Sequence, residues 1–185
     1  MVKILHILTY YLYFVKFLYS SLYCIIGIMN IHIVKASSTG PTALAAFDNA
    51  LSKAGIADQN LIYLSSIIPP GSKMLKQSPG FDNKEFGNRL YVVMAQQRVI
   101  ERHKQAWAGI GWVQDKATGK GLFVEHHGFS DDQVQQDIHN TLTEMMKSRP
   151  NNDWSKIHME IEGIICGNKP VCALVAAVYK SEGWD

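Results

Sequence analysis

The sequence is poor in cysteine and has no run of like charge. Only three cysteines occur in 185 residues. Cys24, Cys166 and Cys172 have no C-x-x-C spacing, so we expect neither a disulfide framework nor a thiolate metal site. Eighteen Lys and Arg residues balance sixteen Asp and Glu residues, and the formal net charge of +2 comes without a basic block. The charge pattern typical of nucleic-acid-binding proteins is therefore missing, and no nucleic-acid partner is expected.

Apolar residues are plentiful by comparison. They make up 47% of the chain, which is enough for one domain with a sizeable core. No internal repeat and no linker-like stretch divides residues 29–185, so this part is expected to fold as a single domain.

Residues 1–28 differ from the rest because Ile4 to Ile28 are almost all apolar or aromatic. The run is long enough to span a bilayer. It is interpreted as a membrane anchor, a signal peptide or a stretch upstream of the true start. No small-residue cleavage site follows it, and Lys16 near its centre would cost about 2.5 to 3.5 kcal/mol in a bilayer. Met29 is favoured as the start, which predicts a cytoplasmic protein and leaves membrane association through residues 1–28 open.

Hydrophobic periodicity predicts a mixed α/β chain. Two stretches with apolar residues at helical spacing predict helices, the first ended by Gly55 and the second capped by Ser130. Short apolar runs predict strands. Turn residues predict a turn at 37–41, a long surface loop at 72–88 and hairpin loops at 115–119 and 167–170. The expected strands are 31–34, 61–68, 89–95, 106–113, 121–127, 157–165 and 171–179, and the expected helices are 42–54 and 130–149.

A serine pair, Ser65 and Ser66, ends an apolar run just before Pro69 and Pro70. Such serines usually cap a loop, and from spacing alone that interpretation is favoured. Ser66 also has a chemical alternative. If the backbone is strained and the oxyanion stabilised, its hydroxyl can attack the Ser65 carbonyl and convert the amide into an ester. Elimination from the ester, followed by hydrolysis with loss of ammonia, leaves a pyruvoyl group.

Three further polar residues lie in positions that allow more than one interpretation. Glu125 shares a strand face with Phe123, where a carboxylic acid beside an apolar ring can act as a general acid, although a strand-end Glu is more often a surface carboxylate. Asp48 is expected either along the apolar stripe of the helix at 42–54 or at the solvent-exposed edge of that stripe. A position along the stripe would be unusual for a carboxylate. Asn60 precedes the strand with the serine pair and is by itself a turn residue.

Neighbouring histidines raise the question of a metal site beside Glu125. Adjacent strand residues point to opposite faces, so His126 and His127 should not chelate one ion without a further ligand. No metal is therefore expected.

Several motifs in one order resemble the pyruvoyl-dependent arginine decarboxylase family, over nearly the whole chain from Met29 to about Tyr179. They are FDNALSKAG at 47–55, NLxxxSSIxPP at 60–70, AWAGIG at 106–111, GLFVE at 121–125, and a helix ending in EMM before Arg149. With this resemblance, self-cleavage becomes the favoured interpretation of the serine pair. His126 departs from the pattern, because an aromatic residue often follows the catalytic Glu.

The resemblance implies a layered α/β/β/α sandwich of the pyruvoyl-dependent histidine/arginine decarboxylase type. It implies self-cleavage between Ser65 and Ser66 into a β chain of residues 1–65 and an α chain of residues 66–185. A covalent pyruvoyl group made from Ser66 would then convert L-arginine to agmatine and carbon dioxide, without an external cofactor or a metal. Trimers with an active site shared between neighbouring subunits are also implied.

Roles for individual residues follow from the same resemblance. Glu125 is expected to donate a proton to the substrate carbon after carbon dioxide leaves, and Asp48 to contact the substrate guanidinium, for which a carboxylate is the matching partner. Asn60 is expected to support cleavage as an oxyanion donor. Ser65 is expected to belong to both the cleavage site and the substrate site.

The sequence leaves two alternative functions open. The same chemistry on lysine is one, because substrate choice depends on Asp48 and a few other contacts. An uncleaved, membrane-tethered binding protein is the other, because of the apolar residues 1–28. Acid resistance and polyamine biosynthesis both begin with the same decarboxylation, so the sequence leaves the physiological role open.

Overall fold

The computed structural model describes residues 29–81 and 83–184. The predicted membrane anchor or misassigned start at residues 1–28 lies outside this part of the chain. Within the described ranges, no helix is both long enough and apolar enough to cross a bilayer.

The described residues form two helices, one 3-10 turn and nine strands. The order along the chain is mixed, with strands preceding, separating and following the helices. The elements are β1 (Asn30–Thr39), α2 (Ala43–Ala54), β2 (Asn60–Tyr63), β3 (Ile67–Ile68), β4 (Lys73–Leu75), η1 (Asn83–Glu85), β5 (Arg89–Val99), β6 (Gln105–Gln114), β7 (Gly121–Gly128), α3 (Asp131–Lys147), β8 (His158–Ile165) and β9 (Val171–Glu182).

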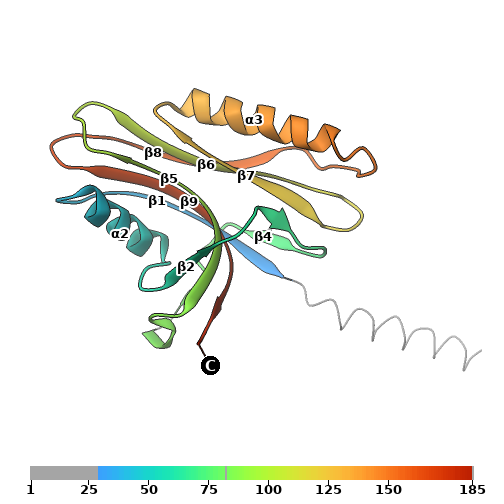
Figure 1. Cartoon of the computed structure of the whole chain (residues 1–185), viewed down its shortest axis with the longest axis horizontal. Coiled ribbons are helices and arrows are strands. Elements are labelled where there is room, and N and C mark those ends of the chain that lie inside the picture. Colours follow the sequence, from blue (N-terminus) through green and yellow to red (C-terminus); the bar gives the residue numbers. More distant parts are fainter. Residues whose placement is uncertain (1–28, 82, 185) are drawn as a thin grey trace, which may run out of the picture.

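These elements stack in four layers, α2, a first sheet, a second sheet and α3 (Figure 1). Over the described residues, sheet A has the strand order β2-β5-β9-β1-β4 and sheet B the order β3-β7-β6-β8. One apolar cluster lies between the two sheets, a second between α2 and sheet A, and a third between α3 and sheet B. The expected α/β/β/α sandwich is confirmed.

Strand β9 lies at the centre of sheet A and is buried on both faces. Val171, Ala173, Val175 and Ala177 belong to the cluster between the sheets. The alternate residues Cys172, Leu174, Ala176 and Val178 belong to the cluster under α2. Burial on both faces explains why this strand is an unbroken apolar run rather than an alternation of apolar and polar residues.

Helix α2 packs on sheet A through small residues. Ala46, Ala50 and Ala54 repeat every four residues and are buried, so the helix backbone can approach the sheet closely. Leu44 is 66% exposed, and Asp48 is exposed on the same side. Leu44 therefore lies outside the buried stripe, which Ala46, Ala50, Leu51 and Ala54 form, and Asp48 takes the solvent edge, one of the two positions that the sequence left open.

Helix α3 packs on sheet B as its sequence predicts. The Ser130 hydroxyl accepts a hydrogen bond from the Gln133 N–H at 3.2 Å and caps the helix. Val134, Ile138 and Leu142 form the buried stripe. The stripe lies over β6, where a Cβ added to Gly111 would overlap the Ile138 side chain. Glycine at this position therefore allows the close approach of α3 to the sheet.

The structure differs from the sequence prediction at four places. The single strand expected at 61–68 is divided into β2 in sheet A and β3 in sheet B. The turn residues 167–170 do not form a hairpin loop, because β8 belongs to sheet B and β9 to sheet A. Residues 37–39 continue β1, and the loop at 72–88 contains β4 and η1. A local apolar pattern identifies a strand but not the sheet that receives it, which explains the first two errors.

Candidate active site

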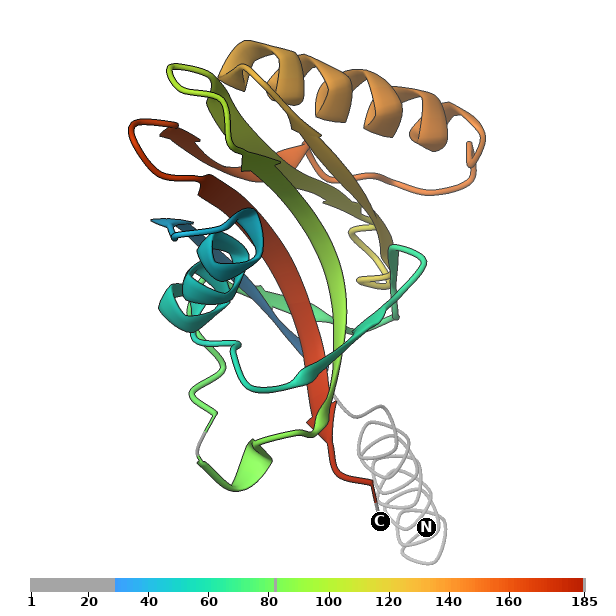
Figure 2. The same ribbon diagram turned by 60° about the vertical axis from the view of Figure 1, so that its left-hand side comes forward.

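The chain passes from sheet A to sheet B between β2 and β3 (Figure 2). Ser66 lies in this connection, directly before β3. Before it, β2 runs parallel to β5. After it, Ile67 pairs with Leu122 of β7, and the Phe123 N–H donates to the Ser66 carbonyl at 2.8 Å. Ser66 itself has a φ of 63°. A residue with a side chain in this left-handed region costs about 1 to 2 kcal/mol, so the surrounding strands hold the serine in a strained conformation.

The Ser66 hydroxyl is directed at the carboxylate of Glu125. Its Oγ lies 2.9 Å from Oε1 and 2.8 Å from Oε2. Glu125 is on β7, on the same strand face as the buried Phe123, but at a position where the side chain is exposed. A carboxylate that accepts a hydrogen bond from a hydroxyl can also take or return a proton at that atom. The structure thus brings together two of the predicted site residues.

Tyr179 forms the inner wall of the site and was not predicted from the sequence. Its hydroxyl donates to the Ile67 carbonyl at 2.8 Å. Its ring packs edge-on against Phe123, with ring centroids 6.2 Å apart. Burial, and to a smaller extent the nearby Glu125 carboxylate, raises the pKa of Tyr179, which keeps the phenol protonated as a donor. The available signal was a single phenol at the end of an aliphatic strand, since a buried Tyr hydroxyl usually needs a partner.

Exposed apolar residues lie on both sides of the serine pair in the sequence. Ile67 is 55% exposed, and Tyr63 is 58% exposed. Ser65 is exposed as well. The Tyr63 hydroxyl lies 3.7 Å from the Met94 sulfur of sheet A.

Asp48 and Asn60 make their contacts elsewhere in the chain. Asp48 lies on α2, which covers the outer face of sheet A, so it belongs to a different layer from the Ser66–Glu125 pair. The Asn60 amide donates to the Gly87 carbonyl at 2.6 Å and ties the start of β2 to the turn before β5. The roles predicted for both residues at the serine pair stay predictions.

The two histidines after Glu125 lie on opposite faces of β7. The His126 imidazole lies 2.9 Å from the Thr141 hydroxyl of α3. His127 is exposed and lies on the alternate strand face. Over residues 29–81 and 83–184, no group of three or more His, Cys, Asp or Glu side chains is arranged to hold a metal ion.

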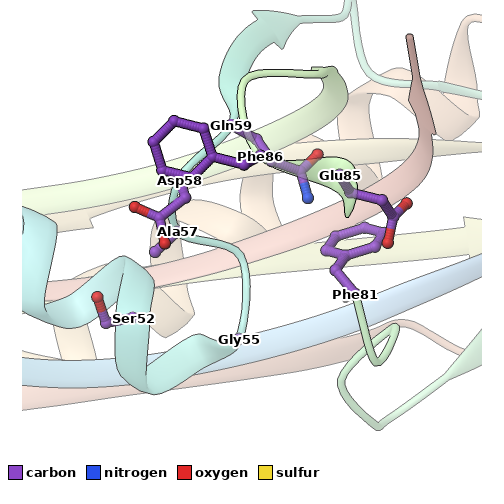
Figure 3. A pocket seen from close by; sticks show the side chains of 8 residues that line it. All are labelled: Ser52, Gly55, Ala57, Asp58, Gln59, Phe81, Glu85 and Phe86. Carbon is purple, nitrogen blue, oxygen red and sulfur yellow. The ribbon is translucent and has the colours of Figure 1, made fainter. Parts of the chain in front are cut away.

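Two surface pockets lie away from Ser66 and Glu125. The first has a volume of about 250 Å³ and lies beside the C-terminal end of α2, where Asp58, Phe81, Glu85 and Phe86 line it (Figure 3). The second, of about 290 Å³, is lined by Lys35, Lys53, Lys76 and Glu160 among others. Neither of these two pockets is lined by Ser65, Ser66 or Glu125.

Together, the fold and the site define a class of protein: an α/β/β/α sandwich in which a strained serine, at the crossing between the sheets, is hydrogen-bonded to a strand carboxylate. A family profile described as "Pyruvoyl-dependent arginine decarboxylase (PvlArgDC)" matches residues 30–183. The chain belongs to the pyruvoyl-dependent arginine decarboxylase family.

Individual relatives agree with this assignment. A pyruvoyl-dependent arginine decarboxylase of Thermoplasma volcanium is 34% identical over 103 residues, which cover 55% of this chain and 57% of the relative. One from Thermococcus sibiricus is 30% identical over 149 residues, which cover 79% of this chain and 91% of the relative. The matched part thus spans little more than half of the Thermoplasma protein and nearly all of the Thermococcus protein.

A solved structure of pyruvoyl-dependent histidine decarboxylase is also similar in part. It matches with a TM-score of 0.38 and 13% sequence identity, over 56% of this chain and 52% of that one.

Proposed function

We propose that this protein cuts itself between Ser65 and Ser66 and then decarboxylates L-arginine to agmatine and carbon dioxide. Membership of the family supports the reaction class. The observation that carries the proposal is the strained Ser66, whose hydroxyl lies 2.8 Å from a Glu125 oxygen.

Cleavage begins at the Ser66 hydroxyl. Its oxygen attacks the Ser65 carbonyl carbon, the C–N bond breaks, and the hydroxyl proton passes to the released nitrogen, so that an ester replaces the amide. Elimination then removes the Ser66 Cα proton, breaks the Cβ–O bond and leaves Ser65 with a free carboxylate. Hydrolysis of the remaining enamine releases ammonia. The left-handed φ of Ser66 supports this route, because relief of strained backbone at a functional site favours the rearrangement.

The residues around Ser66 fit the group expected after cleavage. The Phe123 N–H and the Tyr179 hydroxyl hold the two carbonyls at positions 66 and 67, so the new start of the α chain stays in place. The pyruvoyl group supplies an electron sink for decarboxylation, as pyridoxal phosphate does in other enzymes. Glu125 then has the position of a proton donor, because its carboxyl group already lies within hydrogen-bond distance of the side chain at position 66.

Substrate recognition is proposed to involve a neighbouring subunit. Asp48 lies on the outer layer of the sandwich, exposed beside Leu44. In an assembly of several copies, proposed here as a trimer, the α2 surface of one copy would cover the exposed rim of Ile67 and Tyr63 on the next. Asp48 would then pair with the arginine guanidinium, and Ser65 would contact the substrate at the cleaved end.

The proposed reaction takes up one proton per turnover and yields a polyamine precursor. It therefore serves acid resistance and polyamine biosynthesis equally well, and we propose that it takes place in the cytoplasm.

Intact mass spectrometry of the purified, denatured full chain tests the proposal first. We expect two chains split between residues 65 and 66, with the start of the α chain reduced by borohydride. Ser66→Ala should remain uncut because it lacks the attacking hydroxyl. Ser65→Ala should still be cut, because the attacked group is a backbone carbonyl that alanine retains. A wild-type chain that stays whole after long incubation would refute self-cleavage.

A substrate competition assay then tests the choice of amino acid. Release of carbon dioxide from labelled arginine should be inhibited strongly by unlabelled arginine and weakly by lysine, because a carboxylate pairs with the planar guanidinium through two hydrogen bonds. Equal inhibition by lysine and arginine would contradict the proposed specificity for arginine and would indicate a broader preference for basic amino acids.

A further inference from the structure

The loop that carries Ser66 is held on its carboxyl side by two hydrogen bonds from different strands. The Phe123 N–H donates to the Ser66 carbonyl, and the Tyr179 hydroxyl donates to the Ile67 carbonyl, each across 2.8 Å. The first bond comes from the backbone of β7 and does not depend on a side chain. The second depends on one phenol, so a single substitution can remove it.

Tyr179 lies at an irregularity in β9. Tyr91 and Val92 of β5 pair with Lys180 and Val178, which leaves Tyr179 as the additional residue of a β-bulge. Bulges redirect side chains and are over-represented beside functional sites. The bulge thus occurs at the residue of β9 whose side chain reaches the Ser66 loop.

The surroundings of Tyr179 leave its hydroxyl little freedom. The residue is only 9% exposed and belongs to the apolar cluster between the sheets. Its ring packs against Phe123, the same residue whose N–H holds the Ser66 carbonyl. The phenol is therefore a fixed donor, held by the strand that also presents Glu125.

We propose that Tyr179 is a positioning residue, which holds the Ile67 carbonyl and thereby keeps position 66 beside Glu125, both before and after cleavage. The inference rests on the proposed self-cleavage and decarboxylation. Once the bond to Ser65 is cut, residue 66 becomes a chain end. The bond from Tyr179 to the next residue is then one of the restraints that keep this end in the site.

The test compares Tyr179→Phe with Tyr91→Phe in the full chain. Both substitutions remove only a hydroxyl, and Tyr91 donates to Glu182, also on β9, at 2.8 Å. Tyr179→Phe should slow cleavage about tenfold, the effect of losing one hydrogen bond that acts on the reacting geometry. In the cleaved fraction, its kcat for arginine should fall about tenfold, with KM changed by less than about twofold. Tyr91→Phe should resemble the wild type in both rates.

Each other outcome contradicts part of the argument. Equal effects of the two variants would overturn the positioning role, as would wild-type rates in Tyr179→Phe. A Tyr179→Phe chain that does not fold would overturn it too, because a positioning role requires a folded variant with a slow reaction. If the wild type is not cut at all, the proposed function fails and the role of Tyr179 falls with it, whereas a cut wild type with an unaffected variant refutes only the role of Tyr179.

Discussion

At the scale of single residues, the site depends on a few side chains and on one unusual backbone conformation. Ser66 supplies a hydroxyl, Glu125 accepts its hydrogen bond, and Tyr179 fixes the next peptide group. The positive φ of Ser66 is not a property of serine in isolation. It results from the strands that hold the chain on both sides of residue 66.

Replacing Glu125 by Gln tests its role as proton donor. The variant retains the shape of the side chain but cannot supply a carboxylic acid proton, so kcat for arginine should fall about 10²- to 10⁴-fold. Carbon dioxide release should be normalised to the cleaved fraction measured by mass spectrometry, so that any effect on cleavage is separated from the effect on turnover. A kcat within about threefold of the wild type would exclude Glu125 as the donor.

The buried thiol of Cys172 should lower the free energy of unfolding at alkaline pH. Burial raises the pKa of its thiol from 9.0 to about 11, although the Arg98 charge lowers it slightly. The unfolded chain therefore loses this proton at lower pH than the folded chain does. The contribution of the protonated Cys172 thiol to the free energy of unfolding is fully present below pH 9 and is lost as the pH rises through about 11.

Denaturant unfolding at a series of pH values measures this effect. The free energy of unfolding of the wild type should fall between about pH 9 and pH 11. Cys172→Ala should show a shallower fall once each protein is compared with its own value at about pH 7.5, which removes the cost of the cavity. Parallel curves would show that another group controls alkaline stability.

At the scale of elements, the geometry of the site comes from the chain crossing between two sheets. Residues 64–66 connect β2, which pairs with β5, to β3, which pairs with β7. Glu125 lies further along β7, on the same strand face as Phe123, which packs between the sheets. A strand continuous over residues 61–68 would hold both serines in one sheet. The break between β2 and β3 is therefore the element-scale feature that brings the hydroxyl to the carboxylate.

The packing of α3 on β6 depends on glycine. In Gly111→Ala, the new methyl group would overlap Ile138, and the free energy of unfolding should fall by about 1 to 3 kcal/mol. Gly167→Ala is the matched control, because nothing lies within 4 Å of its added Cβ. Its stability should change by no more than about 0.5 kcal/mol. Equal melting temperatures for the two variants would show that α3 can shift without cost.

At the scale of the whole molecule, the Asp48 carboxylate, which is proposed to bind the substrate, and Ser66 lie in different layers of the sandwich. Asp48 lies on the α2 layer, and Ser66 lies at the junction of the two sheets. Leu44, four residues before Asp48, and Ile67, directly after Ser66, are both exposed, and the proposed assembly of several copies predicts that they are buried between copies.

Co-expression of a variant with weakened substrate binding and a variant without activity tests this arrangement. Asp48→Asn should raise KM for arginine about 10- to 100-fold through loss of a charged hydrogen bond, and Ser66→Ala should have no activity. If sites are shared, co-expression of the two should restore some sites with wild-type KM, formed by Asp48 of one copy and position 66 of another. Activity showing only the high KM of Asp48→Asn would exclude sharing.

The sequence by itself predicted most of the helices and strands and, through the family resemblance, the reaction class. Helical and strand periodicity predicted α3 and the hairpin of β6 and β7, because these contacts are local and their apolar faces repeat regularly. Motifs around Ser66 and Glu125 predicted the family and the pair of residues that the structure brings within 2.8 Å. The sequence left Asp48 open between the apolar stripe of α2 and its solvent edge, and the structure has it at the solvent edge, because Ala46, Ala50, Leu51 and Ala54 form the buried stripe.

Only the tertiary structure decided which strands pair with one another and which side chains meet at the site. Pairing partners of β2, β3, β8 and β9 depend on contacts distant in sequence, which local patterns do not encode. The positive φ of Ser66 and the bond from Tyr179 to Ile67 exist only after the two sheets pack. Tyr179 is 112 residues from Ile67 in the chain, and packing of the sheets is the physical reason that they meet.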